Sequence, residues 1–184
     1  MQASLTGHLV FSTLHTNDAP GAVTRLVDMG VEPYLVASSL ESVLAQRLVR
    51  VLCKECKQPD HSPTAEAFKA QLGIPASVTI YKSVGCRECR NTGFLGRAAI
   101  FEWMDTDNEI RQLILKAGST DQVRDAARKA GMRTLAEDGW RLVRQGVTTV
   151  EEVLSVTTAK EVASATKGDG EDETSPADLA VTRG

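Results

Sequence analysis

The sequence lacks three features that mark common classes of protein. Aromatic residues make up 4% of its 184 residues, too few for the stacked rings that bind single-stranded nucleic acids. No apolar run approaches the roughly 18 residues of a membrane-spanning helix. The first residues do not form the basic, apolar and small-residue regions of a secretion signal. We therefore expect no transmembrane segment and a location in the reducing cytoplasm.

The net negative charge of the chain comes entirely from its C-terminal end. Residues 1–158 hold 18 basic and 18 acidic residues, whereas residues 159–184 hold three basic and six acidic residues and carry the whole net charge of −3. A neutral body offers no electrostatic attraction for nucleic acid as a main partner. The acidic tail, residues 159–184, has almost no large apolar side chain, which predicts that it is disordered.

Cysteine is confined to one stretch of the sequence. There it forms two Cys-x-x-Cys motifs, Cys53 with Cys56 and Cys86 with Cys89. Two intervening residues let both thiolates of a tight turn face one tetrahedral ion, and two such turns predict a closed structural zinc site. Residues 57–85 must then loop out and return to the metal. Cations near the pairs favour thiolates. They are Arg47, Arg50, Lys54, Lys57, Arg87 and Arg90.

Other interpretations of the cysteines compete with a structural zinc site. Two disulfides would need an oxidising compartment, and the sequence has no export signal. A thioredoxin-like redox motif would need only one of the two pairs. A zinc ribbon that binds nucleic acid is a third alternative, although the cations around these cysteines lack interleaved aromatic residues.

The N-terminal part of the chain has the pattern of a parallel α/β sheet. Residues 8–14 form a short apolar run with branched side chains and no helical period, which predicts a strand buried on both faces. A polar turn follows, in which Asn17 or Asp18 can cap the next helix. Ligands of parallel sheets bind at the carboxyl ends of strands, where His15 and Thr16 fall.

Apolar periodicity and residues that end helices predict the secondary structure of the middle of the chain. A second helix, with Pro33 in its first turn and one apolar face, should run to Leu48. Within the loop between the cysteine pairs, residues 64–72 indicate a short helix and residues 78–81 a short strand. Residues 98–103 indicate another strand, close to the metal.

From residue 107 onward the pattern is wholly helical. Four segments with narrow apolar faces are separated by glycines that end helices. These glycines are Gly118, Gly131 and Gly146. Ser119 with Gln122, and Thr149 with Glu152, have the spacing of capping boxes and predict two helix starts. The four helices should form a small bundle.

Four blocks of the sequence are distinctive in combination. They are Thr6–Asn17, Val43–Arg50, Gly85–Arg97, and Gly131–Trp140 together with Gly146–Leu154. In this order they resemble the secretion and type IV pilus assembly ATPases, the family of general secretion pathway protein E and the pilus extension motors. The resemblance covers residues 1 to about 158. It implies an α/β fold: the C-terminal portion of a RecA-like phosphate-loop ATPase core with a parallel sheet, followed by a tetracysteine zinc module and a small helical bundle.

The resemblance also implies a function. Members of the family are homo-hexamers at the cytoplasmic face of the inner membrane, and they couple ATP hydrolysis to pseudopilus or type IV pilus assembly and protein secretion. Inner-membrane platform proteins would be the partners. ATP and Mg would be cofactors of the full-length family only, because this sequence has no Gly-x-x-x-x-Gly-Lys-Ser/Thr loop and no apolar strand that ends in an acidic pair. We expect a gene fragment or truncated product that is inactive alone.

The block at residues 6–17 resembles the histidine box of the family. By that resemblance, His15 faces the γ-phosphate as its sensor, and His8 is the second histidine of the box. Thr13 and Thr16 are candidate nucleotide contacts beside them. From the residues alone, His15 would be a capping or surface histidine, and His8 would bond only backbone at the start of a buried strand.

We expect four parts along the chain. They are residues 1–50 of the ATPase core, a zinc-binding module over 51–105, a helical C-terminal domain over 106–158 and the acidic tail. Two functions fit this organisation. The chain is either part of a motor ATPase, as the histidine box indicates, or a non-enzymatic zinc-stapled interaction module that docks on membrane secretion components, as the absent phosphate loop indicates.

Overall fold

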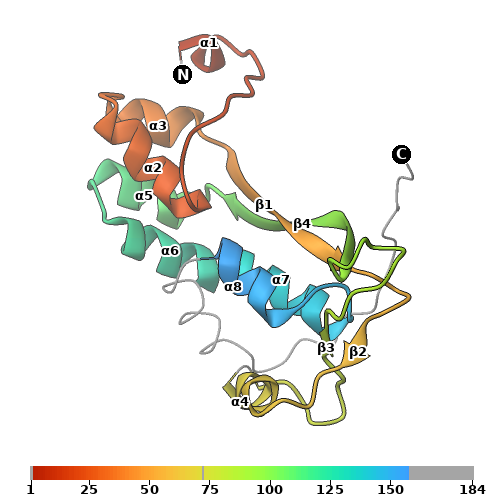
Figure 1. Cartoon of the computed structure of the whole chain (residues 1–184). Coiled ribbons are helices and arrows are strands. Elements are labelled where there is room, and N and C mark those ends of the chain that lie inside the picture. The colour runs from red at the N-terminus through yellow and green to blue at the C-terminus, as the bar shows by residue number, and fades with distance from the viewer. Residues whose placement is uncertain (1, 72, 158–184) are drawn as a thin grey trace.

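An antiparallel two-stranded ribbon runs through the computed structural model, which describes residues 2–71 and 73–157 (Figure 1). Its strands are β1 (Ser42–Leu52) and β4 (Phe94–Asp105). The helices are α1 (Gln2–Leu5), α2 (Ala19–Asp28), α3 (Pro33–Ser39), α4 (Pro63–Gln71), α5 (Asn108–Leu115), α6 (Thr120–Lys129), α7 (Leu135–Arg144) and α8 (Val150–Val156). Strands β2 (Gln58–Pro59) and β3 (Tyr81–Lys82) form a second, very short antiparallel pair.

The two faces of the ribbon have different surroundings. The register pairs Leu44 with Trp103 and Arg47 with Ile100, so side chains alternate between an inner and an outer face. Ile100 and Met104 point to the inner face and are buried, whereas Leu44 and Trp103 point to the outer face and are about half exposed. The helices therefore pack on one face of the ribbon.

Three groups of buried side chains hold the helices, and two of these groups include residues of the inner face. At one end, α2, α3, α5 and α6 pack around Met104. In the middle, α7 lies on the ribbon through contacts of Leu135 and Leu142 with Ile100. The third group lies on the same helix, where Trp140 of α7 packs with α4, α8 and the segment before β3. This continuous packing connects the N-terminal helices to the cysteine region.

The expected strand over residues 8–14 is absent, and the prediction of a parallel sheet was wrong for the described residues. Residues 8–16 have no regular secondary structure, and Leu9 and Phe11 are 82% and 88% exposed. A strand buried on both faces needs backbone partners along its edges. No strand within residues 2–71 and 73–157 pairs with this segment, since both described sheets are antiparallel pairs formed elsewhere.

The second predicted helix was also wrong beyond its first part. Helix α3 ends at Ser39, and residues 43–48 lie in β1. The hydroxyls of Ser38 and Ser39 both donate to the carbonyl of Leu35, which competes with continuation of the helix. The next residue, Leu40, is extended (φ −81°, ψ 118°). Long-range pairing with β4 then decides the conformation of an apolar run that also fits a helix.

Most other predicted elements are confirmed. Asp18 caps α2 by accepting the N–H of Gly21 at 2.9 Å. The helix expected over residues 64–72, the strand over 98–103 and the four later helices are all present, whereas the strand expected over 78–81 begins only at Tyr81. Residues 159–184, predicted to be disordered, lie outside the described residues.

The two predicted capping boxes have different outcomes. The box of Ser119 and Gln122 is complete at the start of α6. Thr149 accepts the N–H of Glu152, but the Glu152 carboxylate bonds Arg50 instead of returning to the cap. A further complete box, Thr134 with Glu137 at α7, was not predicted.

Candidate metal centre

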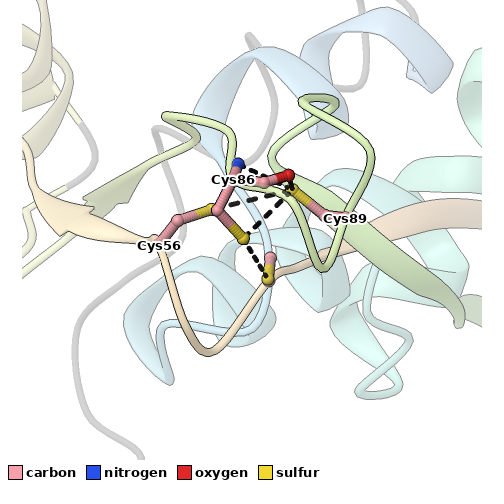
Figure 2. A group of neighbouring side chains, drawn as sticks. Cys56, Cys86 and Cys89 are labelled. Atoms are coloured by element: carbon pink, nitrogen blue, oxygen red, sulfur yellow. Dashed lines mark hydrogen bonds between the residues drawn. The ribbon is translucent and has the colours of Figure 1, made fainter.

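The ribbon brings the two cysteine pairs together. Cys53 directly follows β1, and Cys89 lies in the turn that leads into β4. The N–H of Cys53 donates to the carbonyl of Gly93 at 2.9 Å, which continues the contact between the two strands into the cysteine turns. Figure 2 shows the sulfur atoms converging from these turns. Residues far apart in the sequence thus form one cluster.

Two glycines allow the turns to approach each other closely. Gly85 and Gly93 have φ angles of 110° and 76°, in the left-handed region that other residues rarely adopt. A Cβ atom on Gly85 would lie 2.9 Å from the carbonyl oxygen of Asn91, and one on Gly93 would lie 2.5 Å from the Cβ atom of Ser83. Only glycine therefore fits at these two positions.

The spacing of the sulfur atoms fits a tetrahedral metal ion. Zinc–sulfur bonds of about 2.3 Å place neighbouring sulfurs of a tetrahedron about 3.8 Å apart. The observed separations are 3.9 Å for Cys53 and Cys86, 3.8 Å for Cys56 and Cys89, and 3.7 Å for Cys86 and Cys89. All four sulfurs lie within 4.8 Å of one another. The set could therefore bind a metal ion such as zinc, and its sulfurs are too far apart for disulfides.

Backbone N–H groups point at two of the sulfurs. Gly85 donates to Cys56 at 3.3 Å, and Cys86 and Gly93 each donate to Cys89 at 3.2 Å. Burial raises the pKa of Cys89. The backbone N–H groups of Cys86 and Gly93, together with the thiols of Cys86 and Cys56, outweigh burial and lower the pKa to about 6. The lowered pKa favours the thiolate of Cys89, which is the form that binds metal.

The pKa of Cys56 is shifted in the opposite direction to that of Cys89. Burial raises the pKa of Cys56 to about 11, the other thiols add to the rise, and the N–H of Gly85 opposes it. The causes of both shifts are burial, backbone N–H groups and neighbouring thiols, not the cations expected from the sequence. Binding of a metal ion would have to displace the proton from Cys56.

Two of those cations instead fix the cysteine region to the helices. Lys57 donates to the carbonyl of Gly146 at 2.8 Å and lies 4.5 Å from the ring centre of Tyr81. Arg50 forms an ion pair with Glu152 and stacks on Phe94 at 4.2 Å. Hydrogen bonds from the Arg50 side chain lower the pKa of Glu152, although burial opposes the shift.

The four residues predicted from the histidine box remain apart from any formed site. His8, Thr13 and His15 are exposed, and Thr16 is partly buried just before α2. The expectation that His8 opens a buried strand was wrong, since its Nδ1 lies 3.0 Å from the hydroxyl of Thr6 in an exposed turn. The role of these residues at a nucleotide stays a prediction.

The fold resembles part of a motor ATPase. The crystal structure of the pilus retraction motor PilT with bound ADP matches with a TM-score of 0.53 and 19% identity, over 87% of this chain and 37% of that chain. At this identity the similarity shows the fold alone. It places the chain in an α/β class, with the small antiparallel sheets described above.

Sequence comparison identifies the family. Residues 1–155 match the family described as type II/IV secretion system protein, and the chain belongs to that family. It is 51% identical over 157 residues to type II secretion system protein E of Pseudomonas aeruginosa, and 44% identical over 161 residues to the type IV pilus assembly ATPase PilB of Myxococcus xanthus.

The match covers only part of these relatives. Each alignment includes 85% of this chain but 31% of the Pseudomonas protein and 28% of the Myxococcus protein. The chain thus spans about three-tenths of the length of the curated relatives that it matches. Among the described residues, no helix is long and apolar enough to cross a lipid bilayer.

Proposed function

We propose that this chain forms part of a hexameric motor ATPase that couples ATP hydrolysis to pseudopilus or type IV pilus assembly and protein secretion. The observation that carries the proposal is the family match over residues 1–155, with 51% identity to a type II secretion system protein E. On this proposal the platform proteins of the machine, at the inner face of the inner membrane, are its partners.

In this function the histidine box supplies the contact to the nucleotide. His15 senses the γ-phosphate, Thr13 and Thr16 lie beside the nucleotide, and His8 has a supporting role. All four lie in or directly after the exposed segment that precedes α2. Exposure of this apolar segment is what we expect if the rest of an ATPase core covers it in the motor.

The tetracysteine cluster supplies structure in the same function. Cys53, Cys56, Cys86 and Cys89 hold one zinc ion, and all four positions are filled by sulfur, so none is left for water or substrate. The zinc module spans residues 51–105, between an ATPase-core part over 1–50 and a helical domain over 106–158. The sulfur spacing supports this assignment.

Nucleotide binding requires groups that this sequence does not contain. Backbone amides and the lysine of a phosphate loop provide most of the grip on the β- and γ-phosphates. We therefore expect no ATP binding or hydrolysis by the chain alone. A titration with fluorescent ATP and Mg tests this expectation, and an affinity in the micromolar range would contradict it.

A second candidate is a non-enzymatic module that docks on secretion components. The observation that favours it is the outer face of the ribbon, where large apolar side chains are 42–52% exposed in adjacent positions. They are Leu44, Leu48, Phe101 and Trp103. Such a face fits a protein surface that a partner covers.

One fusion separates the two candidates. The full chain would be joined behind the part of the Pseudomonas aeruginosa relative that precedes the aligned region, and the ATPase activity of the fusion would be measured. A motor subunit should hydrolyse ATP, and His15→Ala should lower kcat by about 10²–10⁴-fold. His61→Ala, an exposed histidine outside the box, is the matched control and should leave kcat nearly unchanged. A folded fusion that binds ATP without hydrolysing it would favour the docking module.

A further inference from the structure

The chain passes abruptly from an exposed segment into the core just after the histidine box. Phe11 is 88% exposed, and His15 is also exposed, whereas Ala19 is fully buried at the start of α2. The position of the box therefore depends on how the first residues of α2 are held. Three consecutive residues, Asn17, Asp18 and Ala19, each contact a different element of the later chain.

Asp18 connects the start of α2 to α6. One carboxylate oxygen accepts the N–H of Gly21 at 2.9 Å and caps the helix, and the other accepts a bond from Arg124 at 2.6 Å. Both side chains of this ion pair are only 14% exposed. Arg124 also binds Asp121 of its own helix, which fixes the orientation of the guanidinium. A largely buried, oriented pair is worth more than a surface pair.

Glu102 connects the start of α2 to α7. Its side chain lies on the inner face of β4 and is 1% exposed. One carboxylate oxygen accepts the N–H of Ala19 at 2.7 Å, and the other accepts the N–H of Leu135 at 3.3 Å. The carboxylate thus serves the first residues of two helices, whose N-terminal dipoles favour a negative charge. A buried carboxylate without such partners would be strongly unfavourable.

Further contacts keep α2 in place relative to α6. The hydroxyls of Thr24 and Thr120 lie 3.0 Å apart, and Val23 packs with Val123 in the same core. His15 precedes Asp18 by three residues, so a fully extended chain limits its distance from that anchor to about 10 Å. The helical domain therefore determines the region that His15 can reach.

We propose that Arg124 and Glu102 are positioning residues for the histidine box. This inference rests on the proposed function, because the box matters only if a nucleotide binds beside it. Neither side chain contacts the nucleotide. Arg124 holds Asp18 and Glu102 holds Ala19, so that His15 and Thr16 occupy a fixed place at the γ-phosphate. Through these contacts, α6 and β4 help to position the nucleotide site.

Kinetics of the fusion described above test the role of Arg124. Arg124→Met should lower kcat by about 10- to 100-fold, because a misplacement of about 1 Å is enough for such a loss. The KM for ATP should change by less than about threefold, since the phosphate loop holds most of the nucleotide. Arg124→Lys keeps a charge that can reach Asp18 and should restore part of kcat.

Arg128 provides a matched control on the same helix. It forms an ion pair with Glu137 at 2.6 Å, with side chains 22% and 15% exposed. Arg128→Met therefore removes a comparable pair that does not involve α2. It should lower the melting temperature about as much as Arg124→Met and leave kcat within about twofold. A structural effect alone would lower both variants equally.

Two nearly isosteric variants test the anchors themselves. Asp18→Asn can still cap α2 but loses the charge that pairs with Arg124, so it should reproduce the loss of kcat. Glu102→Gln can accept only one of the two N–H groups, and its amide nitrogen then faces a donor. In the full chain without the fusion, it should speed amide exchange at Ala19 and Leu135 relative to Val49.

The outcomes of these experiments distinguish a failure of the proposed function from a failure of the positioning role. If a fusion with the unaltered chain folds but does not hydrolyse ATP, the proposed function fails and the positioning role falls with it. If that fusion is active and Arg124→Met and Asp18→Asn both keep the parent kcat, only the positioning role is wrong. Equal losses of kcat in Arg124→Met and Arg128→Met would also overturn it.

Discussion

The tetracysteine cluster and the histidine box differ in how much of their surroundings the chain itself provides. All four sulfurs and the N–H donors that face them come from residues 53–93, and two paired strands bring these residues together. Residues 8–16 of the histidine box pair with no strand among the described residues, and Leu9, Val10 and Phe11 are exposed. A closed site can form within a chain segment, whereas a buried strand requires neighbouring strands.

Of the changes that test this difference between the two regions, loss of the metal should affect the stability of the fold most. Cys86→Ser or a chelator should unfold residues 51–93, because a structural zinc ion contributes on the order of 10–16 kcal/mol in small zinc domains. Helices α5 and α6 should persist, and exchange at residues 8–16 should not change. Metal analysis and hydrogen exchange would test this. One zinc per chain is expected, and a zinc content near zero would contradict the site.

Truncation of core side chains should have the next largest effect. Trp140 is 1% exposed and packs with Ile80 in the core beside the cysteine region. Trp140→Ala should therefore cost about 3–5 kcal/mol in the free energy of unfolding. Phe11→Ala is the matched change in the histidine box and should alter it by less than about 0.5 kcal/mol. Urea denaturation measures both, and similar costs would show that the box is covered in the free chain.

Two glycine substitutions in the cysteine region should lower the stability of the fold by different amounts. Gly93 and Gly96 both have left-handed φ angles, of 76° and 85°, but only Gly93 has neighbours within 4 Å of an added Cβ atom. Gly96→Ala should cost about 1–2 kcal/mol from backbone strain. Gly93→Ala should cost about 1–3 kcal/mol more from overlap with Ser83. Equal melting temperatures for the two variants would contradict the close approach of the turns.

The smallest expected effect is a pH dependence. Hydrogen bonds from Arg50 lower the pKa of Glu152 in the folded chain, so this carboxylate stabilises the fold above the pKa that it has when unfolded. The stabilisation is lost as the pH falls through the folded pKa. Because Arg50 is 54% exposed, it should amount to less than about 1 kcal/mol. Glu152→Gln should remove this stabilisation at pH 7, change the stability little at the lowest pH, and so flatten the stability profile below pH 5.

The sequence predicted elements whose signals are local. The Cys-x-x-Cys spacing, the Ser119 cap and the glycine stops each depend on a few neighbouring residues. The prediction of a helix over residues 40–48 was wrong because their apolar spacing fits a helix, and only pairing with β4 decides for a strand. Residues 8–14 do carry a strand pattern, but no strand within residues 2–71 and 73–157 lies beside them.

The contacts that hold α2 were not predicted, for a related reason. An acidic residue between the apolar residues Ile100 and Met104 is a visible signal of a buried polar group, but its partners lie 83 and 33 residues away. Arg124 has no local signal that separates it from Arg128 on the same helix. Assignments of this kind require the three-dimensional arrangement.

The ribbon has one further mechanical consequence. With 11 residues in β1, at about 3.3 Å per residue, it extends roughly 36 Å. One end lies in the group of buried side chains around Met104, with α2 and α6, and Cys53 directly follows the other end of β1. It is thus a lever arm, and a rotation of about 10° at the α2 end would displace the cysteine turns by about 6 Å over that length.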